Sequence, residues 1–369
     1  MLGMTPRLAY RTSLGHAYQG DSRELMATLE PGSVDLIVTS PPFALTRKKE
    51  YGNEQEEAYL EWFDTFVEPF KRVLSDTGSL VIDIGGAYLP GKPVRSTYHF
   101  QLAIELSKHF DLCQEFYWYN PAKLPSPAEW VNVRRVRVKD ALNLVLWFAK
   151  DGSRTKADNR RVLKRYSESM QNLLKNGYQY RVRPSGHDIS DKFMQDNGGA
   201  IPPNLLGFAQ EVEELGGDWG QLDGDIFDSL FPNLVALSNT ASNDPYQKRC
   251  KQAKIKPHPA RFPVGLPAFF IEFLTETGDT VLEPFAGSNT TGAAAEALGR
   301  RWISCDLDHE GDRHDTYVRA SSFRFDGVTW AEGFEHNEIT GDYETEAYYA
   351  EGKKAAKQTQ QLALFGNDD

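Results

Sequence analysis

Short aliphatic runs alternate with amphipathic stretches in two separate parts of the 369-residue chain. The runs typical of buried strands cover residues 34–40, 78–86 and 141–150 in the first part, and residues 279–287 and 300–308 in the second. The stretches with helical spacing cover residues 56–75, 98–110, 267–278 and 289–299. Because strands alternate with helices, the sequence predicts an α/β fold in which a twisted mixed sheet carries helices on both faces.

The stretch between these two parts, residues 151–256, has weak periodicity, many polar residues and frequent Gly and Pro. That composition predicts an inserted module rather than more of the sheet. We therefore expect four regions. They are a first half of the sheet domain over 1–150, the module over 151–256, a second half over 257–326, and an acidic, flexible tail over 327–369.

Composition indicates a globular chain, since hydrophobic residues make up 40% and aromatic residues 12%. The sequence contains no run of about 18 apolar residues, and its start lacks a basic region followed by an apolar stretch. We therefore expect a soluble, cytoplasmic protein. The three cysteines, Cys113, Cys250 and Cys305, lie far apart, which favours buried thiols over a disulfide framework or a metal site.

The formal net charge of −11 counts against a nucleic-acid partner unless the acidic residues lie away from a basic face. They are concentrated in two segments. Residues 209–231 hold seven acidic residues and no Lys or Arg, and residues 326–369 hold ten acidic residues and three Lys. The rest of the chain is slightly basic, with clusters at residues 46–52, 132–139 and 180–188. Such clusters are either solvated faces or phosphate contacts.

A ligand site is indicated in the second part, where a strand, a Gly-containing turn, a small-residue helix and another strand follow each other over residues 279–308. Gly287 lets the backbone approach a ligand, and Asp306 at the next strand can accept from ribose hydroxyls. Asn289 stands where a dinucleotide fingerprint has a glycine, which disfavours a pyrophosphate. Glu283 can meet a positive charge, so a ligand with an adenosine and a cationic tail, such as S-adenosylmethionine, fits better.

A second motif, Ser40-Pro41-Pro42-Phe43, ends the strand over residues 34–40. Proline fixes the backbone and lacks an N–H, so nearby carbonyl oxygens stay available to accept hydrogen bonds from an amine. Ser40 can accept one proton, and Phe43 can stack on a base removed from a duplex. As a bare tetrapeptide, the motif is more typical of an ordinary strand-ending turn.

The pairing of this motif with the turn "EPFAGSNTTG" resembles the β group of DNA amino-methyltransferases, and the resemblance spans residues 14–325. It also rests on the segments "GGAY", "FYWYNPAKLPSPAEWVN", "RPSGHDI", "DNGGAIPPNLL" and "HPARFP". The family implies a Rossmann-like fold that uses S-adenosylmethionine, with residues 1–150 as the catalytic half, 151–256 as the target-recognition region and 257–326 as the donor-binding half. Two departures are the acidic insertion at 207–240 and the tail beyond 327.

The resemblance assigns a role to each matching residue. It places the target amine at Ser40, Pro41, Pro42 and Phe43, with Asp83 as a second hydrogen-bond partner. It places the methyl donor against Glu283, Phe285, Ala286, Gly287, Ser288, Asn289, Thr290, Thr291 and Asp306, with His258, Arg261 and Phe262 near its methionine end. Catalysis would rest on positioning and on electrostatic stabilisation of the amine.

The implied activity is methylation of the N4 amine of a flipped cytosine in double-stranded DNA, in a CAGCTG-like palindrome, with or without a partner restriction endonuclease. Adenine-N6 methylation is the alternative, because the two chemistries share the loop. Ser at its first position favours cytosine, whereas Asp or Asn is expected for adenine. A non-catalytic DNA-binding protein on the same scaffold is a further alternative, although it would be expected to lose the motifs that this chain keeps.

The basic clusters would then contact DNA phosphates and make binding salt-dependent. The predicted DNA-binding residues are Arg47, Lys48, Lys49, Arg134, Arg135, Arg137, Lys139, Arg181, Arg183 and His187. Those of the middle module are candidates for base readout.

The end of the tail carries Gln361, Leu362, Ala363, Leu364 and Phe365 after a polar, acidic run. Exposed apolar side chains cost solubility, so their presence in a tail indicates a use. The pentapeptide resembles the QLxLF motif that docks in a groove of the bacterial sliding clamp. The alternative is a small helix that packs on the parent domain.

Overall fold

Ten strands form one sheet in the computed structural model, which describes residues 5–43, 56–120, 123–177, 195–207, 245–255, 257–258, 263–307 and 317–334. The strands are β1 (Arg7–Arg11), β2 (Gly15–Gln19), β3 (Val34–Thr39), β4 (Leu74–Ile84), β5 (Asp111–Tyr119), β6 (Leu142–Ala149), β7 (Leu205–Gly207), β8 (Thr280–Glu283), β9 (Arg301–Asp306) and β10 (Thr329–Trp330). Their order in the sheet is β10-β1-β2-β9-β8-β3-β4-β6-β5-β7. Both parallel and antiparallel neighbours occur, so the predicted mixed sheet is confirmed.

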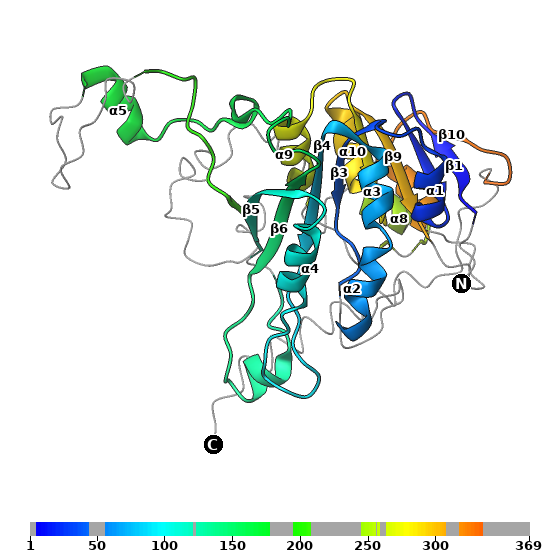
Figure 1. The fold of residues 1–369 in the computed structure, drawn as a ribbon, viewed down its shortest axis with the longest axis horizontal. Coiled ribbons are helices and arrows are strands. Elements are labelled where there is room, and N and C mark those ends of the chain that lie inside the picture. The colour runs from blue at the N-terminus through cyan, green and yellow to red at the C-terminus, as the bar shows by residue number, and fades with distance from the viewer. Residues whose placement is uncertain are drawn as a thin grey trace.

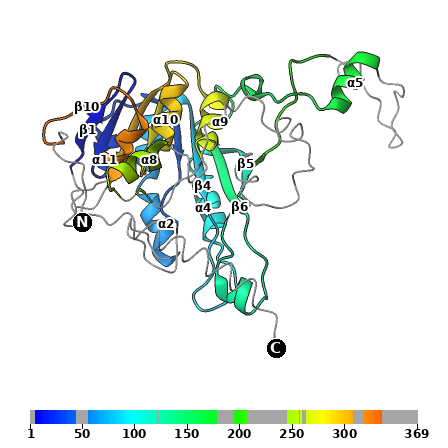
Figure 2. The same ribbon diagram turned by 180° about the vertical axis from the view of Figure 1, so that it is seen from behind.

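Helices cover both faces of this sheet, as predicted (Figure 1 and Figure 2). One face packs against α1 (Ser22–Thr28), α2 (Glu56–Asp64), α3 (Val67–Val73) and α4 (Tyr98–Leu106). The other packs against α9 (Gly265–Leu274), α10 (Thr290–Ala297) and α11 (Tyr317–Ser321). Residues alternate between the two cores along each central strand, and on β6, for example, Val145 faces α9 whereas Leu146 faces α4. This burial on both faces explains the continuous apolar runs of the sequence.

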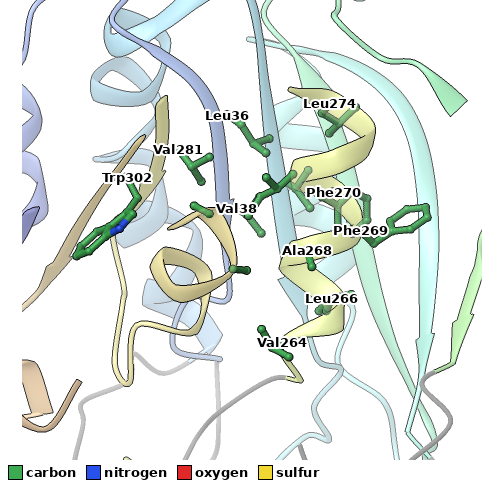
Figure 3. Packing of buried hydrophobic residues seen from close by; sticks show 14 of the residues in the cluster. Leu36, Val38, Val264, Leu266, Ala268, Phe269, Phe270, Leu274, Val281 and Trp302 are labelled. Carbon is green, nitrogen blue, oxygen red and sulfur yellow. The ribbon is translucent and has the colours of Figure 1, made fainter. Parts of the chain in front are cut away.

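The packing of α9 on the sheet shows how the two central strands are held in place (Figure 3). Phe270 and Leu274 of α9 are at most 1% exposed and pack over Leu36 of β3 and Val281 of β8. Full burial of each such side chain stabilises the fold by about 1.5–3 kcal/mol. The two central parallel strands are thereby fixed against one helix.

One predicted element differs from the structure. We expected a single helix over residues 56–75, but the structure has two helices, α2 and α3, separated at Thr65 and Phe66. Pro69 has no N–H and its ring would clash with the carbonyl of residue 65 in a continuous helix. The backbone N–H groups of Thr65 and Phe66 bond instead to the carbonyl groups three residues earlier, on Trp62 and Phe63.

The middle region contributes to the sheet more than its composition predicted. Residues 205–207 form β7, which pairs in parallel with β5 at one edge. In contrast, α5 (Glu168–Asn176) lies well away from the sheet in both views (Figure 1 and Figure 2). Residues 208–240 of the acidic insertion and residues 335–369 of the C-terminal tail lie outside the described residues. Residues 327–334, which we expected in a flexible tail, are described and include β10, which pairs with β1, so this part of the predicted tail belongs to the sheet. The division into four regions otherwise stays a prediction. Among the described helices, none is long and apolar enough to span a membrane.

Candidate active site

Three parallel neighbours, β8, β3 and β4, end at the same edge of the sheet. From β3 the chain continues to β4 on one side, whereas from β8 it continues to β9 on the other. In α/β proteins the crevice at such a reversal of strand order is where ligands bind. The two predicted motifs follow β3 and β8 and so begin at this point. A hydrogen bond joins the strand ends, since Thr39 Oγ1 donates to Glu283 Oε1 over 2.5 Å.

Ser40, the first residue of the proline motif, is hydrogen-bonded to Asp83 near the end of β4. Its Oγ donates to Asp83 Oδ2 over 3.0 Å, and Asn143 Nδ2 of β6 donates to Asp83 Oδ1, also over 3.0 Å. Asp83 is only 4% exposed. Burial raises the pKa of this carboxyl to about 6, although the bonds from Asn143 and Ser40 and the charge of Lys123 oppose the rise. The structure therefore brings together two residues that lie 43 positions apart in the sequence.

Phe43 packs against Gly85, which follows β4. A Cβ on Gly85 would lie 2.6 Å from the Phe43 ring, so the glycine is what lets the ring approach. Tyr98 of α4 donates a hydrogen bond from its hydroxyl to the Gly85 carbonyl and fixes this stretch from behind. Pro41 is buried and Pro42 is half-buried beside the ring. The predicted stacking of Phe43 on a base stays a prediction.

The turn after β8 adopts a conformation that suits ligand binding. Gly287 has a φ of 49° and Asn289 a φ of 53°, both in the left-handed region. Asn289 then caps α10, because its side chain accepts from the Gly292 N–H over 3.1 Å, and its amide donates to the Tyr10 hydroxyl over 3.2 Å. Asn tolerates the left-handed region and is a preferred cap. Asn289 therefore holds the left-handed turn without a glycine and caps the helix that follows.

Asp306 at the end of β9 bends toward the same turn. Its Oδ2 accepts from the Gly287 N–H over 2.6 Å. The predicted proximity of this carboxylate to the glycine turn is therefore present, whereas its bonds to a ribose stay a prediction.

Glu283 is a buried carboxylate with three donors. Its Oε1 accepts from Thr39 Oγ1 and from the Phe285 N–H over 3.1 Å, and its Oε2 accepts from Thr291 Oγ1 over 2.9 Å. The residue is 2% exposed. Burial raises its pKa to about 7 despite these bonds. Glu283 thus connects the end of β3, just before the proline motif, with the turn and the start of α10 through a single side chain.

Several contacts behind the turn were missed from the sequence. Arg324 Nε donates to the Ser288 carbonyl over 2.6 Å, and its guanidinium lies 4.6 Å from the centre of the Tyr246 ring. The Tyr246 hydroxyl accepts from the His258 N–H, and the His258 ring lies against Gly287. No local pattern marks Tyr246 or Arg324, because both reach the turn from distant parts of the chain.

The described part of the basic clusters, Arg134, Arg135, Arg137 and Lys139, is exposed on the segment before β6. This segment begins with the π-helical turn η1 (Glu129–Val133) and lies beyond the carboxyl end of β4 (Figure 1). Arg137 Nη2 donates to the Pro93 carbonyl over 2.5 Å, and Arg134 lies 5.3 Å from the centre of the Trp130 ring. Outside the described residues lie Arg47, Lys48, Lys49, Arg181, Arg183, His187, Arg261, Phe262, Gln361, Leu362, Leu364 and Phe365.

The mixed sheet carries a proline loop after one strand and a glycine turn, with two carboxylates beside it, after another. This combination is typical of the methyltransferases that modify exocyclic amines. The chain matches the N6/N4 DNA methylase family over residues 34–313 and belongs to that family. The order of its motifs, with the proline loop first, is that of the predicted β group.

Two comparisons narrow the position within the family. The type II methyltransferase M.PvuII of Proteus hauseri is 45% identical over 330 residues, which are 88% of each chain. A solved structure of the PvuII DNA methyltransferase, described as cytosine-N4-specific, superposes with a TM-score of 0.64 at 39% identity and covers 91% of this chain and 94% of that one. The predicted resemblance is thereby confirmed.

Proposed function

We propose that the chain is a site-specific DNA methyltransferase that transfers a methyl group from S-adenosylmethionine to the N4 amine of a cytosine flipped out of double-stranded DNA. The observation that carries the proposal is the Ser40–Asp83 hydrogen bond at the end of β3 and β4, beside the glycine turn. Similarity to M.PvuII over most of both chains supports cytosine-N4 as the target and restriction-modification as the setting.

The residues around the turn fit S-adenosylmethionine. Gly287 has no Cβ and so leaves room for the His258 ring, and Asp306 lies beside the turn for the polar hydroxyls of an adenosine. Glu283 supplies a carboxylate that would stabilise a cationic group. Three hydrogen bonds from the surrounding residues hold this carboxylate in place. When bound, the donor supplies a methyl group made electrophilic by the adjacent sulfonium.

The chain's own contribution is to hold and orient the amine. Its nitrogen is a poor nucleophile because the lone pair is delocalised into the ring. The Ser40 hydroxyl donates its hydrogen bond to Asp83, so the lone pairs of its oxygen can accept a hydrogen bond from an N–H of the amine. Pro41 and Pro42 add no backbone N–H that would compete for such acceptors. The carboxylate of Asp83 then stabilises positive charge that develops on the amine.

DNA would approach across the carboxyl edge of the sheet. Arg134, Arg135 and Lys139 are exposed at this edge, and Arg137 ties their segment to the loop after β4. Their charge suits phosphate contacts that orient a duplex over the site. We place base readout in the middle region, where Arg181, Arg183 and His187 remain candidates.

The proposal is tested by incubating wild-type protein with duplex DNA and labelled S-adenosylmethionine, followed by nucleoside mass spectrometry and sequencing of modified sites. We expect N4-methylcytosine in CAGCTG-like palindromes. The Ser40→Ala variant controls for contaminating enzymes, and its rate should fall by roughly tenfold or more, because one acceptor for the amine is lost. If the product is N6-methyladenine, the protein is an adenine methyltransferase that uses the same site. If the protein binds the donor but methylates no base, it is a non-catalytic DNA-binding protein on this scaffold.

Partners beyond DNA are proposed on sequence alone. We infer a cognate restriction endonuclease from the similarity to M.PvuII, and a sliding clamp from Gln361, Leu362, Leu364 and Phe365. Deletion of residues 358–369 should abolish co-elution with a bacterial clamp while leaving methylation of short duplexes unchanged. Equal clamp binding by the full chain and the deletion would contradict the tail proposal.

A further inference from the structure

A continuous chain of hydrogen bonds runs behind Ser40 and ends on a lysine. Ser40 Oγ donates to Asp83, Asn143 Nδ2 donates to Asp83, and Lys123 Nζ donates to Asn143 Oδ1 over 2.8 Å. Lys123 also lies 3.5 Å from the Leu142 carbonyl. These hydrogen bonds therefore connect the loop before η1, through β6, with β4 and the proline motif.

Lys123 determines which end of the Asn143 amide faces Asp83. An ammonium group can only donate, so the amide must turn its oxygen toward Lys123. Its NH2 group then points at Asp83 and lies 3.0 Å from Oδ1 and 3.4 Å from Oδ2. In the opposite orientation the amide oxygen would face a buried carboxylate, and both groups would lose a partner. Asn143 is 8% exposed, so water cannot readily replace either bond.

The orientation of Asn143 in turn affects Ser40. An ionised Asp83 held by the Asn143 amide has Oδ2 placed to accept the single hydroxyl hydrogen of Ser40. That leaves the Ser40 oxygen as an acceptor only. Loss of the amide bond would free the carboxylate to rotate or to take up a proton, and the serine hydrogen would then compete with the N–H groups of the amine.

The charged groups around this chain of hydrogen bonds also favour an ionised Asp83. Among the described residues, Lys123 is the cation whose charge favours the ionised form of Asp83 and so lowers its pKa. Burial lowers the pKa of Lys123, while Asp140 and Asp83 act in the opposite direction and Arg95 acts with burial. Arg95 is itself paired with Asp140, so much of the charge facing Lys123 from the neighbouring loop is compensated.

We propose that Lys123 is a positioning residue for methyl transfer, which fixes the Asn143 amide and thereby holds the Ser40–Asp83 pair in the state that accepts the target amine. The proposal rests on the function proposed above. It assigns to Lys123 no contact with the substrate, and it distinguishes this lysine from the exposed cations that face DNA.

The test compares Lys123→Met with the wild type and with Lys108→Met, a matched control at an exposed lysine that pairs with exposed Glu105. We expect Lys123→Met to lower kcat at saturating donor and DNA at least tenfold, with DNA affinity changed less than twofold. Lys123→Arg, which still donates to Asn143, should recover much of the rate. Lys123→Met should also raise the pKa of Asp83 by roughly 0.5 or more, measured by carboxyl carbon NMR on aspartate-labelled protein.

Unchanged kcat and unchanged Asp83 titration in folded Lys123→Met would overturn the proposal. Weaker DNA binding at full kcat would also overturn it, because Lys123 would then be a phosphate contact. If Lys123→Met does not fold, Lys123→Gln is used in the same two measurements. The Asp83 titration needs no turnover, so a wild-type product other than N4-methylcytosine would contradict the proposed function while the titration still decides the role of Lys123.

Discussion

Replacement of Asp83 by Asn is expected to lower the rate of methyl transfer by about 10²–10³-fold, a loss typical of removing one pre-organised electrostatic group. The amide keeps the volume of the carboxylate but carries no charge, and its NH2 group can turn toward Ser40 Oγ as a donor. Ser40 would then lose its hydrogen-bond acceptor, Asp83 Oδ2, which lies 3.0 Å from Ser40 Oγ. Single-turnover rates with pre-bound DNA measure this step, and donor and DNA affinities serve as controls for the fold.

The pH dependence gives the sharper result. Asp83 has a pKa of about 6, raised by burial, so its carboxylate is present above that pH and is lost as the pH falls through it. We expect the single-turnover rate of the wild type to decline on the acid side near pH 6. S-adenosylmethionine is kept saturating at every pH, because Glu283 also titrates in this range. Under that condition the Asp83→Asn variant should be slow and its rate independent of pH. A wild-type acid limb that persists unchanged in Asp83→Asn would assign it to another group.

The sequence predicted the centre of this molecule well and its edges poorly. Strands β3, β4, β6, β8 and β9 are apolar because both of their faces are buried, which leaves a strong local pattern. Strand β5 has several exposed residues and a register shift against β6, and β1, β2 and β10 are short strands at one end of the sheet. Their pairing depends on contacts with distant segments, so no short window of sequence contains the signal.

The candidate site shows the same division. The proline motif and the glycine turn could be found because each is a contiguous pattern that does its chemistry through local backbone geometry. Asn143 could not, because it reaches Asp83 only through the antiparallel register of β4 and β6, in which Asp83 lies opposite Val145. Lys123 lies in a segment that the resemblance covers, but its partner is 20 residues away. Identifying such residues requires the strand register, which the sequence alone does not supply.

Glu283 sets a second large expectation, this time in stability. Its folded-state pKa of about 7 lies above the ordinary value of 4.5, because burial penalises the charged form more than its three donors favour it. Between these two values the folded chain binds more protons than the unfolded chain, so the free energy of unfolding falls as the pH rises. The destabilisation is complete above about pH 7 and amounts to on the order of 3 kcal/mol.

The Glu283→Gln variant removes this titration and keeps a side chain of the same size. We expect the variant and the wild type to melt at similar temperatures near pH 4.5, and the variant to melt several degrees higher at pH 8, since 1 kcal/mol corresponds to about 2–4 °C in a domain of this order of size. The same variant should bind S-adenosylmethionine less tightly at pH 8, because a neutral amide cannot meet a cationic group. A charge that destabilises the fold is then retained for binding. Equal melting temperatures across the whole pH range would show instead that Glu283 titrates normally, and undiminished donor affinity would remove it from the donor site.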